Sequence, residues 1–277
     1  MRAKSLEAVL LVTPALLFLV IWFVMPLARL FSLAFVGDAT TPAPFGELIA
    51  SEVYRHVFLR TLGIAALVTI VTLLLSYPLS VFLSRLRGVR FFLALYGVLL
   101  PLWISVLVRT FSWMLLLERN GPINKALAFV GLTDHPLPLL FNDTGVLIGM
   151  VHVMVPYAVI PLYAAITRID RRLLLASDGL GANPLFTFRK VYLPLSMPGI
   201  VAAAVFVFLL SLGFFVTPAL LGGSNAMTAP MLIAGFISDR LAWSLAAAAS
   251  LILLASVLAL LWFVSRLVAL PQGTLVR

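Results

Sequence analysis

The sequence predicts an all-α protein that crosses a membrane several times and forms one domain over residues 1–277. Three observations predict this class. Hydrophobic residues make up 63% of the chain and charged residues only 10%, whereas about 25% of a typical soluble domain is charged. Six apolar runs are each long enough to cross a bilayer. The basic residues gather in short segments beside these runs, as expected for a membrane protein.

The six predicted spans follow from length, because a hydrocarbon core about 30 Å thick requires roughly 20 helical residues. The first run follows Arg2 and Lys4, as in a signal peptide. It is too long for one and no small-residue cleavage site follows it, so we interpret it as an uncleaved span. Prolines inside the runs are expected to be kinks. The spans cover about 9–35, 61–84, 91–117, 145–167, 199–221 and 241–267.

The charges of the loops predict the orientation of the chain. Six spans place both termini on the same side of the membrane. On that side the sequence places twelve basic and three acidic residues, and on the other side it places seven basic and seven acidic residues. Loops rich in Lys and Arg remain in the cytoplasm. We therefore expect the N-terminus, the C-terminus and the loop 168–197 to be cytoplasmic.

The ionisable residues disfavour several kinds of function. No carboxylate falls near the middle of a predicted span, which argues against an ion-coupled secondary transporter. Arg29 and Arg109 are expected near the outer interface, where long side chains reach the headgroups. His152 has no acidic neighbour, so a hydrogen bond to another helix is favoured over a role in an intramembrane enzyme. The chain has no cysteine, and we expect no catalytic residue and no metal site.

The chain also lacks a nucleotide-binding loop. A P-loop places glycine directly before its lysine, so that backbone amides cradle the phosphates. None of the three lysines, Lys4, Lys125 and Lys190, follows a glycine. Any ATPase that drives this protein must therefore be a separate polypeptide. The net charge of +9 lies in loops beside apolar runs, so we expect a membrane and not nucleic acid as the partner of these charges.

The basic loop 168–197 is the most informative part of the sequence. Residues 171–176 are good helix formers. Gly181 suits the left-handed position that ends a helix. Asn183 can cap a second short helix, with Pro184 at its first position. The loop therefore predicts a helix–glycine–helix unit.

The second helix of this unit carries the apolar residues Leu185, Phe186 and Phe188. Pro194 and Pro198 are expected to stop it ahead of the fifth span. Two interpretations are open from physical chemistry alone. The helix rests its apolar side chains among lipid headgroups, or it docks into a groove of a partner protein.

The order of residues in the loop is Leu175-Ala176-Ser177, then Gly181, then Val191-x-Leu193-Pro194. This spacing resembles the EAA loop of the permeases of ATP-binding cassette (ABC) importers. That pattern is Glu-Ala-Ala, three residues, Gly, nine residues and Ile-x-Leu-Pro. Leu175 replaces the usual glutamate, so we expect the coupling contact to be mainly apolar. Val191 is a conservative replacement of isoleucine.

The resemblance implies a type I ABC importer permease fold in the bacterial inner membrane, with a coupling helix over about 182–188. It implies a second permease subunit, two copies of a cytoplasmic ABC ATPase and an extracytoplasmic substrate-binding protein as partners. ATP and Mg²⁺ are expected on the ATPase, and no cofactor on this chain. The residues assigned to the coupling loop are Ala176, Ser177, Asp178, Gly181, Ala182, Asn183, Pro184, Leu185, Phe186, Phe188, Leu193 and Pro194.

Two further segments, 109–124 with its Arg-Thr-Phe-Ser-Trp start and 211–223, resemble spermidine/putrescine-type permeases, closer to the first of the two permease subunits. The resemblance implies a polyamine or related small polar solute as the cargo, and a different small solute is the alternative. Aromatic faces can hold a cation, although interfacial and packing roles stay open for each aromatic residue. The candidates for the substrate path are Trp113, Glu118, Tyr157, Phe214 and Phe215.

Three smaller features complete the expectations. Lys125–Val130 is expected to form a short outer helix that contacts the binding protein or lies in the interface. Gly213 and Gly222-Gly223 either bracket a bend or allow close helix packing. The alanine run 246–249 lets the sixth span approach a neighbour closely.

Overall fold

The computed structural model describes residues 12–37, 43–223 and 226–269. These residues form helices and connecting turns, and none of them lies in a strand. Backbone contacts divide the chain into two compact units. Unit 1 consists of Met1–Phe58 and Leu232–Arg277, and unit 2 of Leu59–Met231. Helices α4 (Glu52–Arg85) and α13 (Ala229–Ser238) each begin in one unit and end in the other.

Unit 1 packs around the alanine run of its last helix. It contains η1 (Val20–Val24), α2 (Met25–Val36), α3 (Pro44–Ala50) and α14 (Trp243–Ala269). Helix α14 packs against α2 and α3. Ala246–Ala249 are buried together with Leu48 and Phe236. The expected close approach of the sixth span is therefore confirmed, because an alanine surface lets two helix backbones come near each other.

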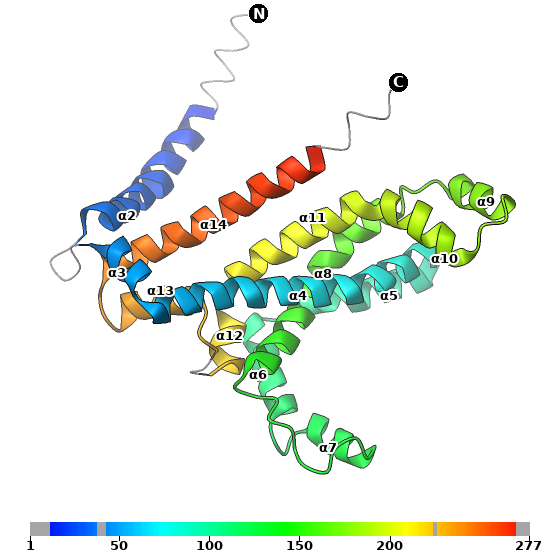
Figure 1. Ribbon diagram of the computed structural model, residues 1–277, viewed down its shortest axis with the longest axis horizontal. Helices are drawn as coiled ribbons and strands as arrows, with labels where there is room; N and C mark the ends of the chain where they lie inside the picture. The colour runs from blue at the N-terminus through cyan, green and yellow to red at the C-terminus, as the bar shows by residue number, and fades with distance from the viewer. Residues whose placement is uncertain (1–11, 38–42, 224–225, 270–277) are drawn as a thin grey trace, which may run out of the picture. The chain divides into compact units, whose positions relative to one another are not determined.

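Helix α8 (Asp143–Ile166) is the centre of unit 2, and it packs against α5, α6, α11 and α12. Met150, Met154 and Leu162 of α8 are fully buried in this core. Figure 1 shows α8 and α11 running beside each other. The other helices of unit 2 are α5 (Gly88–Trp103), α6 (Val106–Leu117), α7 (Pro122–Phe129), α9 (Arg171–Gly179), α10 (Pro184–Thr187), η2 (Phe188–Tyr192), α11 (Leu193–Leu212) and α12 (Val216–Leu221).

Glycines set the distance between α8 and its neighbours. A Cβ atom on Gly199 of α11 would lie 2.3 Å from the Cβ of Ala165 in α8. A Cβ atom on Gly149 of α8 would lie 2.5 Å from a methyl group of Leu221 in α12. Small residues at these positions are what allows the three helices to pack at this distance.

Five described helices are long and apolar enough to cross a membrane, and a bent helix pair brings the total to six. The five are Val12–Val36, Glu52–Arg85, Asp143–Ile166, Pro184–Leu212 and Trp243–Arg266. The third span differs from the continuous helix expected over 91–117. It is a bent pair of Gly88–Trp103, which is α5, and Val106–Phe129, which includes α6, with an angle of 99° between the two halves.

The fifth span also differs from its expected bounds of 199–221. It starts at Pro184, ends at Leu212, and is followed after a break by the short helix α12. The bend considered at Gly213 is therefore present. Gly222 serves close packing as well, because a Cβ atom there would lie 2.5 Å from the Cβ of Ala226.

The outer segment after α6 is held by one buried side chain. Asn124 of α7 donates to the carbonyl oxygens of Glu118 and Leu137, both at 3.1 Å. Its own amide oxygen accepts from the backbone N–H of Leu137 at 2.9 Å. These bonds tie α7 to the chain on both sides of it, and they confirm a short helix near 125–130.

Candidate functional site

The first half of the loop 168–197 is the helix α9. Asp170 caps its start by accepting from the backbone N–H of Arg172 at 2.9 Å. The chain leaves the helix through Gly181, whose φ of +81° is a left-handed conformation that glycine adopts without strain. The N–H of Gly181 donates to the carbonyl of Asp178 at 3.0 Å. The predicted glycine end of this helix is confirmed.

The second half begins as predicted and then departs from the prediction. Asn183 caps α10 by accepting from the N–H of Phe186 at 2.7 Å, and Pro184 occupies the first turn. The expected stop at Pro194 and Pro198 is wrong, because α10 continues through η2 into α11. Leu193 donates to the carbonyl of Phe188, five residues back, in a π-turn. This wider turn accommodates a proline ring, which would clash with a carbonyl in a regular α-helix.

A side-chain bond joins the two halves of the loop. The hydroxyl groups of Ser177 in α9 and Thr187 at the end of α10 lie 2.9 Å apart, and Ser177 is buried. The helix–glycine–helix unit is therefore closed by a hydrogen bond as well as by its turn. Because α10, η2 and α11 form one continuous helix, a displacement of α10 moves the start of the fifth span directly.

The unit exposes several large apolar side chains beside its charged residues. Leu175 is 68% exposed, Leu180 is 89% exposed and Leu185 is 64% exposed. Phe186 is also exposed. Phe188 differs from these, because its ring stacks on Tyr192 at 6.3 Å and meets the edge of the Tyr77 ring at 6.1 Å. Phe188 therefore connects the loop to α4.

The remaining residues assigned to the coupling loop occupy its surface and its turns. Ala182 and Leu193 are half-buried, and the others are exposed. The exposed ones are Ala176, Asp178, Gly181, Asn183, Pro184 and Pro194.

A buried arginine of α6 lies against the break between α5 and α6. Only 7% of Arg109 is exposed, so its side chain packs inside the protein and does not extend to lipid headgroups. Its position near the outer interface stays a prediction. The Arg109 guanidinium donates to the carbonyl of Ile104 at 2.7 Å and to the carbonyl of Pro101. Both carbonyls lie at the end of α5, where the carbonyl of Pro101 also accepts from the backbone N–H of Ile104 at 3.3 Å. One arginine of α6 thus caps the helix that precedes it, across the bend.

Two further bonds hold α6 in place. The hydroxyl of Thr110 lies 3.3 Å from the hydroxyl of Thr217 in α12. The indole N–H of Trp113 donates to Nδ1 of His152 in α8 at 3.0 Å. The expected hydrogen bond of His152 to a neighbouring helix is therefore present, and Trp113 is its partner. Helix α6 is bonded to α5, α8 and α12 by side chains within two turns.

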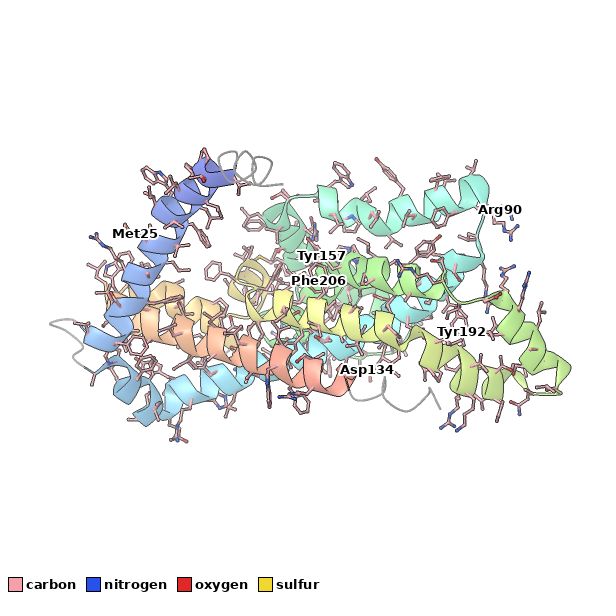
Figure 2. The ribbon with its side chains drawn as sticks, turned by 90° about the horizontal axis from the view of Figure 1, so that it is seen from above. Met25, Arg90, Asp134, Tyr157, Tyr192 and Phe206 are labelled. Carbon is pink, nitrogen blue, oxygen red and sulfur yellow. The ribbon has the colours of Figure 1, made fainter. Side chains whose placement is uncertain are left out.

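Three of the five substrate-path candidates, Trp113, Tyr157 and Phe214, pack against one core cluster of unit 2, whereas Glu118 and Phe215 do not belong to it. Tyr157 of α8 meets Phe206 of α11 edge to face at 5.8 Å, and Figure 2 shows the two residues side by side. Phe214 packs against the core of unit 2, whereas Phe215 beside it is 43% exposed. Glu118 is exposed at the end of α6. Trp113 bonds to His152, as described above.

The roles of Phe206 and Arg109 were missed from the sequence. Both depend on which residues of another helix segment lie opposite them, and no local pattern carries that information. Among the described residues no group of three histidine, aspartate or glutamate side chains could hold a metal ion.

Comparison with known proteins identifies the family. Residues 65–270 match the family described as binding-protein-dependent transport system inner membrane component. The chain belongs to this family. The matched region includes the loop 168–197, the α5–α6 break and all of α8 and α11. The protein is accordingly a multi-pass inner-membrane permease subunit and not an enzyme.

Three relatives illustrate the similarity. The chain is 34% identical to the spermidine/putrescine transport system permease protein PotB of Escherichia coli K12 over 223 residues, which cover 79% of this chain and 81% of PotB. It is 34% identical to PotB of Salmonella typhimurium LT2 over 238 residues, covering 84% and 82%. A bacterial alginate ABC transporter, solved with an alginate pentasaccharide-bound periplasmic protein, has the same fold. The TM-score is 0.74 at 19% identity, covering 95% of this permease and 93% of that chain.

Proposed function

We propose that this permease forms half of the membrane path of a polyamine importer, with spermidine or putrescine as its cargo. The observation that carries the proposal is the similarity to PotB, which extends over about four fifths of both chains. Both termini and the α9–α10 loop lie in the cytoplasm in this proposal, on the side with the excess of basic residues.

The partners follow from the family and from the shape of the loop. A second permease subunit completes the path, an extracytoplasmic binding protein delivers the solute, and two ATPase subunits bind ATP and Mg²⁺. The apolar residues Leu175, Leu180, Leu185 and Phe186 form the surface that docks on the ATPase. Leu175 stands where EAA loops usually have glutamate, so the nearest exposed carboxylate in the sequence of the loop is that of Asp178.

The path holds its cationic cargo through aromatic faces. In unit 2 the ring centroids of Tyr157 and Phe206 lie 5.8 Å apart. Phe215, which follows the end of α11, is partly exposed. A cation over such a face is stabilised by about 0.5–2 kcal/mol, depending on how much water is removed. Replacing Tyr157 with leucine should therefore raise the KM for uptake about threefold to thirtyfold.

The cargo is tested by uptake of labelled spermidine into cells that express the whole importer. Unlabelled putrescine is expected to compete, whereas molybdate and neutral oligosaccharides are not. A solute of another class is the second candidate, because an alginate transporter has the same fold. Uptake that is indifferent to polyamines but present for such a solute would reject the polyamine assignment and leave the ABC permease assignment intact.

The docking role is tested separately with Phe186→Asp, which places a charge on the apolar surface. We expect the purified permease to retain less ATPase and uptake to fall at least tenfold, about 1.4 kcal/mol or more of lost docking free energy. Phe129→Asp is the matched control, because Phe129 is a highly exposed phenylalanine on α7, outside the loop. Equal ATPase retention by the two variants would show that residues 183–188 do not dock.

A further inference from the structure

The membrane-facing end of the α9–α10 unit contains a basic cavity that coupling to an ATPase does not explain. The cavity has a volume of about 320 Å³. Three arginines, Arg85, Arg87 and Arg171, contribute to its wall. They come from the end of α4, the turn before α5 and the start of α9. The other residues that line it are Ser84, Ile166, Thr167, Ile169, Leu174 and Tyr192.

Within the described part of the chain, no carboxylate forms an ion pair with these three guanidinium groups. The ion pair found among the described residues joins Arg60 to Asp143, and no acidic residue lines the cavity. The hydroxyl of Thr167 is already bonded to the carbonyl of Tyr163 at 2.9 Å. The donors that remain for a ligand are therefore mainly the arginines, and a guanidinium fork matches the geometry of a phosphate group.

The depth of the cavity matches that of lipid headgroups. Arg85 is the last residue of the span Glu52–Arg85, and Ile166 is the last residue of the span Asp143–Ile166. The wall of the cavity thus combines the ends of two spans with the first residues beyond them. Basic pockets at this level of a membrane protein bind the headgroups of anionic lipids.

An apolar groove continues from the same arginine toward the interior of the membrane. It has a volume of about 340 Å³ and is lined by Tyr77, Pro78, Val81, Phe82, Arg85 and Phe188. Residues 78, 81, 82 and 85 share one face of α4. At 1.5 Å per residue the groove follows α4 for about 12 Å above Arg85. Arg85 lines both spaces. Phe188 of the groove also stacks on Tyr192 of the cavity, so the two spaces adjoin at α4 and at η2.

We propose that the cavity and the groove form one binding site for an anionic phospholipid. The phosphate lies among Arg85, Arg87 and Arg171, and an acyl chain follows the groove along α4. The apolar groove favours a lipid over a free phosphate ion, and the depth at the span ends favours a lipid over an acidic surface of the ATPase. Because Tyr192 and Phe188 belong to the continuous helix that begins at α10, the bound lipid supports the element that transmits ATPase motion.

The test measures lipid retention by native mass spectrometry of the purified importer. Phosphatidylglycerol and phosphatidylcholine are titrated into detergent-solubilised wild type and into the triple variant Arg85→Gln, Arg87→Gln, Arg171→Gln. We expect wild type to prefer phosphatidylglycerol by about tenfold or more, and the triple variant to lose this preference. Arg172→Gln is the matched control, because Arg172 is an exposed arginine of α9 outside the cavity, and it should retain the preference.

A second variant separates a lipid from a free anion. Val81→Phe fills the groove without changing any charge, so it should weaken the binding of both lipids while the preference for phosphatidylglycerol, which the arginines set, remains. Val108→Phe, at an exposed valine of α6, should have no effect. Three results would overturn the proposal. The triple variant and Arg172→Gln could bind phosphatidylglycerol equally, or inorganic phosphate at millimolar concentration could displace the lipid. The third is that the ATPase, and not the lipid, protects the three arginines from chemical labelling.

The site is independent of the cargo, so failure of polyamine uptake would leave it standing. In the assembled importer, reconstituted in vesicles of phosphatidylcholine with and without one fifth phosphatidylglycerol, the anionic lipid should raise ATPase activity in wild type and not in the triple variant. An equal response of both proteins would count against the proposal.

Discussion

Two helices of unit 2 meet an interruption, and they respond in opposite ways. Helix α5 ends at Trp103, and the chain turns by 99° into α6. The helix that starts at Pro184 contains two prolines near its middle and nevertheless continues to Leu212. The first interruption provides side-chain donors for the freed carbonyls through Arg109. The second passes Pro194 through a π-turn, and Pro198 lies within α11. A helix therefore ends where another group satisfies its carbonyls, and a proline alone does not end it.

The largest effect that the comparison predicts belongs to Arg109→Ala. The substitution leaves two carbonyl groups at the end of α5 without their charged donor, which costs roughly 3–5 kcal/mol in this buried position. The purified importer should lose thermal stability and most of its uptake. Arg119→Ala is the control, because Arg119 is exposed and its removal should change stability by no more than about 0.5 kcal/mol.

If Arg109→Ala prevents assembly, Arg109→Lys keeps the charge and removes the guanidinium fork. We expect it to assemble and to recover part of the uptake, since a lysine reaches one of the two carbonyls. A distance distribution between spin labels at positions 89 and 115, on the two sides of the bend, should broaden in this variant. An unchanged distribution with wild-type uptake would mean that the bend does not depend on Arg109.

A second, smaller effect is expected from Gly199→Val on the continuous helix. The new side chain would start 2.3 Å from the Cβ of Ala165, so α11 must move away from α8, at a cost of about 1–3 kcal/mol. Ala202→Val is the control on the exposed face of the same helix. Measured melting temperatures that agree for the two variants would show that α11 does not need its close contact with α8.

A third effect concerns the connection between α9 and the continuous helix. Ser177→Ala removes the hydrogen bond to Thr187, which contributes about 1 kcal/mol. Hydrogen exchange of the backbone amides in α9 and α10 should become faster, while the amides of α8 remain unchanged. Ser112→Ala is the control, since the Ser112 hydroxyl is exposed and bonds within its own helix. Faster exchange throughout unit 2 would argue against a local role.

The smallest effect is expected from Pro194→Ala. Because the helix already passes this position through the π-turn, the substitution should change stability by no more than about 0.5 kcal/mol. Circular dichroism should show no gain in helix content. A clear gain would mean that Pro194 interrupts the helix in solution, and the contrast with the α5–α6 break would then disappear.

The sequence predicted the local features of the loop correctly. Asn183 as a cap, Pro184 in the first turn and Gly181 at a left-handed position each depend on the conformational preference of one residue. It did not predict the course of the helix beyond Phe188 or the bend after Trp103. Both depend on backbone hydrogen bonds that are completed by residues farther along the chain, and hydropathy is the same for a straight and a bent apolar segment.

The candidate path residues show the same division. Trp113 and Tyr157 were selected as aromatic residues within spans, and this much follows from residue type. Their partners, His152 and Phe206, are 39 and 49 residues away in sequence, on other helices. No periodicity relates such positions, so the pairs could be found only from the packing of α6 and α11 on α8.

The sequence by itself determined that the chain is a helical membrane protein, which side of the membrane its charges favour, and that the loop 168–197 is a helix–glycine–helix unit. These properties are sums over many residues or preferences of single residues, and neither requires knowledge of distant contacts. The tertiary structure decided where α5 ends, that α10 and α11 are one helix, and that Arg85, Arg87 and Arg171 share one cavity. Each of these depends on which groups lie opposite one another after the helices have packed, and hydropathy and single-residue preferences carry no information about that.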